Sequence, residues 1–571
     1  MPARARRWRR MRLAAAVAAA LVGSIVAVAA PSASAASGPL DRIDHFVVIY
    51  QENHSFDNLY GGWEGVNGGA RADAAHTTQV SQAGGAFTCL LQNDVNLTSP
   101  PLPASCTDTT TGTPFTSAFA NEPFVIDRFI PATATTCPPP GVFAANGVLN
   151  GSGLPGGCTR DLVHRFYQEQ YQLDGGRQDR YVTGSDAVGL AMGVYDTTML
   201  PIYTYLHQRG HPRYAIADDF FQAAFGGSYL NHHWLIAART PTWPGAVSDG
   251  SADDLHSIVD TNGMPTNYPL YSTPVAKKDA SLTVACPAPA AGIVCGDYSV
   301  NTTQPPYQPY APGTPESRRL PAQTAPTIGD RLSAAGRDWA WYAGGWSNAN
   351  GDVGAPGWTN GGGPACADPA ANPAATFPNC PDKLFQFHHQ PFNYYANYAP
   401  GTTARARHLR DEQEFVQLAR SSSKDCRLKP VSFVKPIGAE NEHPGYASEA
   451  DGSDHLVELL TAIQHSGCAK DTMVIVTYDE FGGAWDHVPP PGQGATAGPH
   501  DQWGPGSRIP ALVLSPLLRG SFVVDHTQHD TTSVLATIEH RFGLAPLGPR
   551  DGGVPDLSSV FAAHQVPPGS G

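Results

Sequence analysis

Two pairs of oxygen-bearing side chains follow directly after apolar, β-branched runs of the chain. Asp479 and Glu480 come after the run MVIVTY, and Glu52 and Asn53 come after IDHFVVIYQ. Such runs are typical of buried strands in a parallel sheet, and ligands of open α/β sheets lie beyond the carboxyl ends of the strands. Because adjacent buried carboxylates are costly without a cation or a proton between them, the two pairs predict a metal site. The alternative for Asp479 and Glu480 is a solvated acidic turn.

A serine in the stretch FGGSYLNHHW is also placed for chemistry. Ser228 follows two glycines and precedes a helix-compatible segment, residues 231–238. A hydroxyl at the N-terminus of a helix lies near free N–H groups and the positive end of the helix dipole, which favour an anion such as phosphate. The alternative is that Ser228 only caps the helix.

The candidate metal ligands all offer oxygen atoms: Glu52, Asn53, Ser228, Asp479 and Glu480. Oxygen ligands suit a hard cation, so we expect one divalent metal ion, with Mg²⁺, Ca²⁺ or Mn²⁺ favoured over Zn²⁺. A cation in contact with the Ser228 hydroxyl would lower its pKa and make the oxygen nucleophilic.

The elements that must position these residues alternate between strands and helices. The expected strands are 46–50, 431–436, 474–478 and 509–515, the expected helices include 161–171, 199–207, 456–465 and 529–542, and a helix followed by a short strand is expected within 327–343. This alternation predicts an α/β fold with a mostly parallel central sheet covered on both faces, a three-layer α/β/α sandwich. If the strands 46–50 and 474–478 are neighbours, the two pairs of candidate ligands converge at one edge of the sheet.

The domain organisation follows from changes in composition along the 571 residues, which include 59 Gly and 52 Pro. We expect a signal peptide at 1–36, a catalytic domain at 37–550 and a C-terminal tail at 551–571, with loop-rich insertions at about 66–159, 241–320 and 346–382. An arginine-rich start, an apolar run and a small-residue cleavage site predict the signal peptide, and therefore a secreted, extracellular protein. The alternative is an N-terminal membrane anchor.

The ten cysteines favour disulfide bonds in an exported chain. The simplest pairing joins nearest neighbours, so that several bonds staple the insertions: Cys89 with Cys106, Cys137 with Cys158, Cys286 with Cys295, Cys366 with Cys380, and Cys426 with Cys468.

The net charge of −14 bears on the partners of the protein. It argues against a nucleic-acid partner, which would call for a basic surface, and it gives no electrostatic reason to bind an anionic membrane. No stretch beyond the N-terminal run is apolar for long enough to span a bilayer, so we expect no stable membrane insertion.

Several motifs together resemble a known family. The stretches IDHFVVIYQENHSFDNLYG, TYDEFGGAWDHVPPP, GPGSRIPALVLSPL and HDTTSVLATIEHRFGL are similar to the signatures of the bacterial phosphoesterase family, which joins non-haemolytic phospholipases C with a group of acid phosphatases. The resemblance implies the fold of the alkaline-phosphatase superfamily, an α/β/α sandwich with a metal and a nucleophile at the strand ends.

The resemblance also implies roles for single residues. Glu52 and Asn53 match the first metal-binding pair, Asp479 and Glu480 match the second pair, and Ser228 matches the nucleophile. The histidines that match the phosphate site are His164, His388 or His389, and His443. Serine in place of threonine at the nucleophile, Asn231-His232 in place of Asn-Arg, and ENHSFDNLYG in place of ENRSFDHYFG point to the acid-phosphatase branch.

We therefore expect a secreted metal-dependent phosphatase that hydrolyses small phosphate monoesters through a phosphoserine intermediate at Ser228. The alternative is a phospholipase C that cleaves phosphatidylcholine-like lipids, in which case a lipid head group is the substrate. A third possibility, of a different class, is a secreted binding protein that keeps the fold without catalysis. Histidines that are protonated to bind phosphate would give a mildly acidic optimum.

Overall fold

The computed structural model describes residues 38–92, 102–130, 159, 161–185, 187–244, 258–259, 277–278, 298–311, 314–359, 384–445 and 447–566. The predicted signal peptide lies outside these residues, as do six of the ten cysteines, Cys137, Cys158, Cys286, Cys295, Cys366 and Cys380. The residues from Pro39 onward form a unit of their own.

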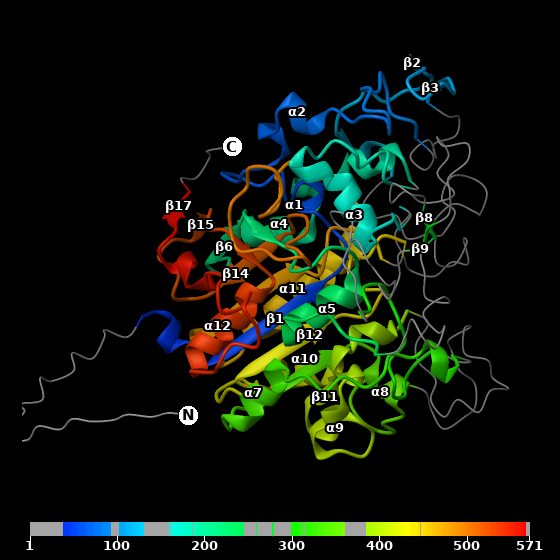
Figure 1. Cartoon of the computed structure of the whole chain (residues 1–571). Helices are drawn as coiled ribbons and strands as arrows, with labels where there is room; N and C mark the ends of the chain where they lie inside the picture. Colours follow the sequence, from blue (N-terminus) through cyan, green and yellow to red (C-terminus); the bar gives the residue numbers. More distant parts are fainter. Residues whose placement is uncertain are drawn as a thin grey trace, which may run out of the picture. The chain divides into compact units, whose positions relative to one another are not determined.

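A nine-stranded sheet forms the centre of this unit (Figure 1). Its order is β11-β10-β12-β1-β13-β14-β6-β15-β17, and β14 and β17 run opposite to the other strands. The strands are β1 (His45–Gln51), β6 (Tyr214–Ala217), β10 (Trp339–Ala343), β11 (Leu409–Asp411), β12 (Val431–Lys435), β13 (Thr472–Tyr478), β14 (Ala511–Leu514), β15 (Phe522–Asp525) and β17 (His564–Gln565). The prediction of a mostly parallel sheet is confirmed.

The strands that carry the candidate ligands lie side by side. β1 and β13 pair in parallel over their whole length, from His45 opposite Thr472 to Gln51 opposite Tyr478. Their side chains are almost all buried because helices cover both faces of the sheet, which explains why each strand is apolar without alternation. The predicted neighbourhood of the two strands is therefore confirmed, and both ligand pairs leave the sheet at the same edge.

Two layers of helices cover the sheet. Adjacent residues of β10 show this, because Trp341 contacts the ring of His232 in α5, whereas Tyr342 contacts Phe415 in α10. α7 and α12 pack with α5, and α11 packs with both α10 and α4. The bounds of these helices are α4 (Pro201–His207), α5 (Ser228–Ala237), α7 (Ile328–Ala334), α10 (Glu412–Ser421), α11 (Glu449–Gln464) and α12 (Thr532–Phe542). The sandwich is thus three-layered, as predicted.

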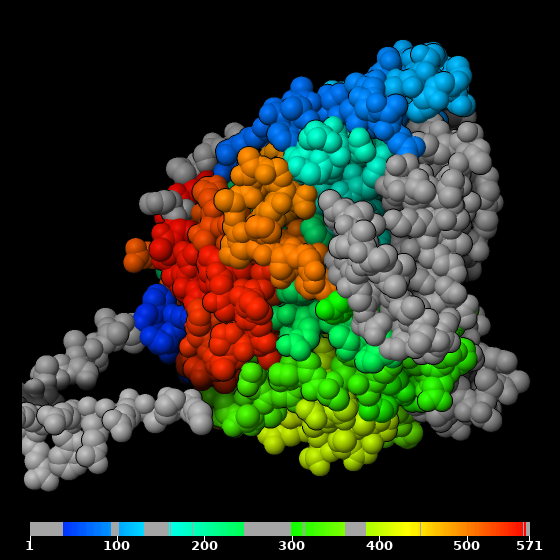
Figure 2. All heavy atoms as spheres, in the orientation of Figure 1, coloured from blue at the N-terminus to red at the C-terminus, as the bar shows by residue number. Residues whose placement is uncertain are grey.

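Shorter helices and strands lie outside the central sheet and the six helices given above. The helices are α1 (Phe56–Leu59), α2 (Ala74–Thr77), α3 (Phe166–Leu173), α8 (Trp346–Asn350) and α9 (Thr403–His408), and the short strands are β2 (Cys106–Asp108), β3 (Phe115–Ser117), β4 (Phe124–Val125), β5 (Gly193–Val194), β7 (Phe220–Phe221), β8 (Ile258–Val259), β9 (Lys277–Lys278) and β16 (His529–Asp530). The loop near residue 494, in orange in Figure 2, lies against the cyan segment around Gly176, where an added Cβ would be 2.9 Å from Gly494 N.

Some predicted boundaries differ from the structure. The helix expected at 161–171 begins only at Phe166, and Asp161 to Arg165 form no helix or strand but line the cavity described below. The segment expected to be a C-terminal tail contains a 3₁₀ helix, Leu557–Phe561, and β17, which pairs with β15.

Two of the predicted disulfide bonds lie among the described residues, and both are present. Cys89 pairs with Cys106, and Cys426 pairs with Cys468. No helix of the described residues is both long and apolar enough to traverse a bilayer.

Candidate active site

The two ligand pairs meet where β1 and β13 end. Asn53 N donates a hydrogen bond to Asp479 Oδ1 over 3.1 Å, and Glu480 N donates to the same oxygen over 2.8 Å. Asn53 adopts a left-handed backbone conformation, with φ of 60°, which asparagine tolerates better than most residues. A Cβ on Gly482 would lie 2.2 Å from the Asn53 carbonyl oxygen, so only glycine allows the second loop to approach the first.

Ser228 lies directly against the first pair. It is the first residue of α5, and its Oγ donates to Glu52 Oε2 over 2.9 Å and lies 3.4 Å from Asn53 Oδ1. The capping alternative is wrong, because Gly227 is the N-cap residue and no side chain caps this helix. The hydroxyl therefore faces the ligands and not the backbone of its own helix.

The loop before Ser228 is fixed by three buried side chains, from α3, from α5 and from the segment after β7. Asn231 accepts from Ala224 N and donates to the carbonyl oxygens of Ala224 and Gly226. Glu169 of α3 accepts from Gly226 N, and Gln222 donates to Glu169 over 3.0 Å. Because these contacts satisfy the polar backbone of the loop, Ser228 is held in one position.

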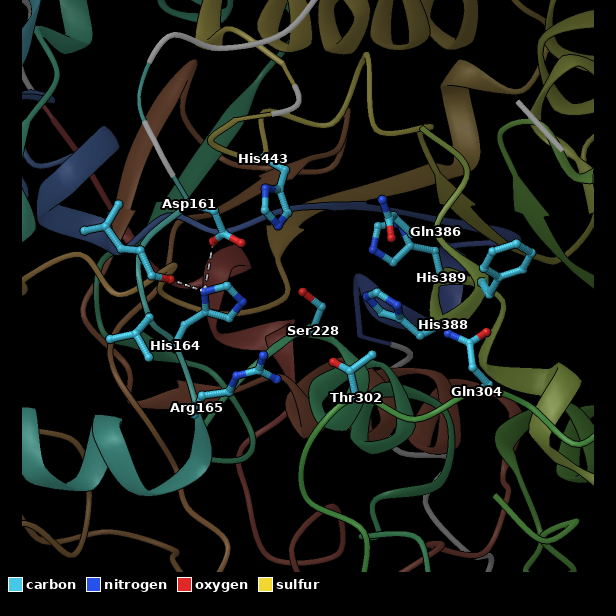
Figure 3. A pocket seen from close by; sticks show the side chains of 13 residues that line it. Asp161, His164, Arg165, Ser228, Thr302, Gln304, Gln386, His388, His389 and His443 are labelled. Atoms are coloured by element: carbon cyan, nitrogen blue, oxygen red, sulfur yellow. Dashed lines mark hydrogen bonds and ion pairs between the residues drawn. The ribbon is translucent and has the colours of Figure 1, made fainter. Parts of the chain in front are cut away.

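A cavity of about 530 Å³ lies over Ser228. Its lining brings together all five predicted catalytic residues: Ser228, His164, His388, His389 and His443. Figure 3 shows Ser228 in the middle, with Asp161, His164 and Arg165 on one side, Gln386, His388 and His389 on the other, and His443 between them. Both of the alternative histidines, His388 and His389, thus belong to the cavity, and His389 is the one that reaches Glu52, at 3.0 Å.

The three acids of the site have different electrostatic surroundings. Burial opposes the ionisation of Glu52, but the contact from His389 and the positive charge of Lys435 outweigh it and hold the pKa of Glu52 well below its ordinary value. Burial, together with the negative charge of Glu52, raises the pKa of Asp479 well above its ordinary value. Burial also raises the pKa of Glu480 well above its ordinary value, although His164 opposes it.

The unpaired oxygens of these acids fit a cation. Asp479 Oδ2 and Glu480 Oε1 are buried and have no hydrogen-bond partner among the described residues. Their nearest basic groups are His232 Nδ1, at 3.8 Å, and His164 Nε2, at 3.7 Å. Buried carboxylate oxygens in this state are stabilised by a metal ion, so the residues present fit the predicted cation.

The candidate histidines differ in charge. The carboxylates of Glu480 and Asp161 overcome burial and raise the pKa of His164 to about 10, so His164 is the protonated member of the set. Burial lowers the pKa of His389 to about 4 and lowers the pKa values of His388 and His443. The hydrogen bonds of His443 define its neutral tautomer. Its Nδ1 lies 2.7 Å from the Pro444 carbonyl oxygen and donates to it, and its Nε2 lies 3.1 Å from Asn53 Nδ2 and accepts from it.

Sequence reasoning missed two residues of this site. Lys435, the last residue of β12, forms a buried ion pair with Glu52 Oε1. His232, one turn after Ser228 in α5, places Nε2 3.9 Å from the same oxygen. The rule that found Glu52 and Asp479, a charged residue at the carboxyl end of an apolar strand, also applies to Lys435 in VSFVK. The i+4 spacing from Ser228 is the corresponding signal for His232.

Fold and site together define an α/β protein whose serine and acid cluster lies under a cavity at the carboxyl edge of a mostly parallel sheet. The chain belongs to the Phosphoesterase family, whose family model matches residues 43–545. The resemblance seen in the sequence motifs is thereby confirmed.

Curated relatives are phospholipases C. Phospholipase C A of Mycobacterium tuberculosis (strain ATCC 25618 / H37Rv) is 33% identical over 167 residues, which are 25% of this chain and 31% of that protein. Non-hemolytic phospholipase C of Burkholderia pseudomallei is 30% identical over 176 residues, 26% of this chain and 25% of that protein. The match thus spans only about a quarter to a third of these relatives. A solved 2-O GAG sulfatase aligns over 66% of this chain and 72% of its own, with 12% identity and a TM-score of 0.28, which is too low to support an inference.

Proposed function

We propose that this chain is a metal-dependent hydrolase that cleaves phosphate monoesters through a phosphoserine at Ser228. The observation that carries the proposal is the position of Ser228 Oγ, which lines the cavity at the start of α5 and donates to Glu52 over 2.9 Å. A hydroxyl oriented by a neighbouring base in a cavity has the arrangement of a covalent nucleophile. Membership of the Phosphoesterase family supports phosphoester hydrolysis as the class of reaction.

The proposed reaction assigns a task to each residue around Ser228. Ser228 Oγ bonds to phosphorus while the bond from phosphorus to the leaving oxygen breaks. Glu52 Oε2 accepts the hydrogen bond that orients the hydroxyl, and the hydroxyl proton passes to solvent. The N-terminus of α5 stabilises negative charge on the phosphoryl oxygens. The imidazolium of His164 protonates the leaving oxygen, and water then cleaves the phosphoserine. A divalent cation held by Glu52, Asn53, Asp479 and Glu480 would lower the pKa of the hydroxyl and neutralise phosphoryl charge.

The lining of the cavity supports a monoester as substrate. His164 and Arg165 bring positive charge to one wall, which suits the two negative charges of a monoester. Among the described lining residues Phe387 is the one phenyl ring, whereas quaternary ammonium groups are usually held by several aromatic rings. Phospholipase C activity on phosphatidylcholine-like lipids is the second candidate, because the curated relatives carry that name.

A pair of chromogenic substrates tests the proposal. The kcat/KM of the purified protein for 4-nitrophenyl phosphate should exceed that for 4-nitrophenylphosphorylcholine when Mg²⁺, Ca²⁺ or Mn²⁺ is supplied. The opposite ratio would establish the second candidate. Acid quenching during turnover of a ³²P-labelled monoester should leave the label on the peptide that contains Ser228. No turnover of either substrate with any of these metals would favour a binding protein without catalysis.

We also propose that the protein is exported. The arginine-rich start and the apolar run that follows it support export, and the two disulfides among the described residues suit an oxidising compartment. N-terminal sequencing of protein collected from the culture medium should begin close to residue 37. Retention of the intact N-terminus in the membrane fraction would show an anchor instead.

A further inference from the structure

Three buried side chains gather around Glu52 Oε1, the carboxylate oxygen that is not bonded to Ser228. Glu52 Oε2 accepts from Ser228 Oγ, whereas Glu52 Oε1 is approached by Lys435, His389 and His232. The carboxylate therefore has two separate faces, one toward the nucleophile and one toward this second group.

Without Lys435 the second group would have the donor set of a transition-metal site. The ligand atoms of Glu52, His232 and His389 all lie within 4.8 Å of one another. Two imidazole nitrogens and a carboxylate oxygen form one of the usual protein donor sets for zinc, with a fourth position left open. The group is distinct in chemistry from the oxygen ligands around Ser228.

Both imidazole Nε2 atoms lie close to Glu52 Oε1, at 3.9 Å for His232 and 3.0 Å for His389, where they could become ligands of a cation. Both Nε2 atoms are buried; His232 Nε2 has no hydrogen-bond partner among the described residues, whereas His389 Nε2 lies 3.0 Å from Glu52 Oε1. His232 Nδ1 lies 2.7 Å from the Ser228 carbonyl oxygen, so Nδ1 carries the proton and Nε2 keeps its lone pair. The two rings are stacked in parallel, with centroids 5.0 Å apart, so their orientation is fixed.

Lys435 brings a fixed positive charge to the same oxygen. It is the last residue of β12, it is fully buried, and its ammonium pairs with Glu52 Oε1 and donates to the Tyr50 carbonyl oxygen over 2.9 Å. A divalent cation at this position would lie within a few ångströms of the ammonium, where repulsion in a buried environment is strong. The ammonium and a metal ion therefore compete for this face of Glu52.

We propose that the Lys435 ammonium takes the place of a second metal ion and keeps a zinc-type ion away from Glu52, His232 and His389. This inference rests on the proposed function, because it assigns the single divalent cation to the Ser228 side of Glu52. Lys435 is then a positioning residue: it acts through Glu52 and does not line the cavity. A built-in cation of this kind cannot be removed by a chelator and is available without any metal in the medium.

Zinc binding by matched variants tests the proposal. Untagged wild type, Lys435→Met, Lys435→Arg and Lys435→Met/His389→Ala are stripped with a chelator and dialysed against the same Zn²⁺ solution, and zinc per chain is measured by mass spectrometry. We expect Lys435→Met to hold one zinc ion more than the wild type. Lys435→Arg keeps a positive charge and should match the wild type, and the double variant should lose the additional ion.

Several outcomes would overturn the proposal. Folded Lys435→Met with the same zinc count as the wild type would do so. If Lys435→Met does not fold, the wild type and His389→Ala decide: equal zinc counts support the proposal, and loss of one ion in His389→Ala contradicts it. A wild type that holds no zinc while Lys435→Met holds one zinc ion would still support the role of Lys435. The metal-dependence of the proposed function is tested separately: turnover of the stripped wild type should return with Mg²⁺, Ca²⁺ or Mn²⁺, and turnover that survives stripping would contradict it.

Discussion

At the scale of single residues, replacement of Ser228 and replacement of Asp479 should both abolish turnover, but only the second loss should respond to added metal. Ser228→Ala removes the attacking oxygen, so turnover should fall by on the order of 10⁴-fold or more, and no concentration of metal should restore it. Asp479→Ala should also abolish turnover, but by weakening the cation, so part of the activity should return at high metal concentration. Steady-state kinetics over a metal titration measure both.

Ser448 provides a matched control for Ser228. Its side chain caps α11 by accepting from Asp451 N, so Ser448→Ala should cost only about 1 kcal/mol of stability and leave turnover unchanged. Near wild-type turnover in Ser228→Ala would show that Ser228 is not the nucleophile.

Glu442 should make the fold less stable as the pH rises. Burial raises the pKa of Glu442 to about 8, against about 4.5 for an exposed glutamate, although the hydrogen bond from Tyr478 opposes this. The folded state therefore holds this proton more tightly than the unfolded chain. The stabilising contribution is complete below about pH 4.5 and is lost as the pH rises through about 8.

Urea unfolding at pH 5 and pH 8 measures this effect. Glu442→Gln imitates the protonated acid, so its loss of unfolding free energy between the two pH values should be smaller than that of the wild type by on the order of 3 kcal/mol. Glu316→Gln, at an exposed carboxyl, is the control and should follow the wild type. Equal pH dependence in Glu442→Gln and the wild type would contradict a buried protonated Glu442.

At the scale of elements, α3 should control the position of the nucleophile without touching it. The two carboxylate oxygens of Glu169 accept from Gly226 N and from Ser507 N. A glutamine in its place has only one oxygen, so its NH₂ group would face one of these N–H groups and that hydrogen bond would be lost. Glu169→Gln should lower kcat by about 10- to 100-fold, because a small displacement of a nucleophile is costly. Gln170→Glu, on the same helix, should leave kcat unchanged.

The metal content separates positioning from general damage in Glu169→Gln. Metal bound per chain should equal that of the wild type, because Glu169 contacts none of the candidate ligands in the interactions of the described residues. A loss of bound metal would mean that the whole edge of the sheet has been disrupted and not the loop before Ser228 alone.

Most helices and strands could be predicted from the sequence, because a short apolar run predicts a buried strand at any position in the chain. The strands β1, β12 and β13 were located in this way, and so were the ligand pairs that follow β1 and β13. The reversed direction of β14 was not predicted, since a short apolar run has the same pattern in either direction. Lys435 was missed because a single lysine at a strand end gains meaning only when Glu52 is known to lie beside it.

At the scale of the whole molecule, the Cys426–Cys468 bond should support the fold without supporting the site. It lies just before β12 and β13 begin, at the edge of the sheet opposite to Ser228, and closes a stretch with a sequence separation of 42. Cys426→Ser/Cys468→Ser should lower the free energy of unfolding by about 4 kcal/mol. At a temperature where the variant is folded, its kcat should equal that of the wild type. A changed kcat would show that the two edges are coupled.

The central place of β1 has a consequence for the synthesis of the protein. Both neighbours of β1 lie late in the chain, and Asn53 meets Asp479 across a separation of 426 residues. β1 is therefore made long before either neighbour and has no pairing strand in this sheet until β12 is made at residues 431–435. Exposed strands of this kind aggregate or recruit chaperones. A chain that stops at residue 430, before β12 and β13, should stay open to protease throughout, whereas the chain that continues to residue 566 should resist it. Resistance of the shorter chain to protease would show that β1 is already buried before its partner strands are made.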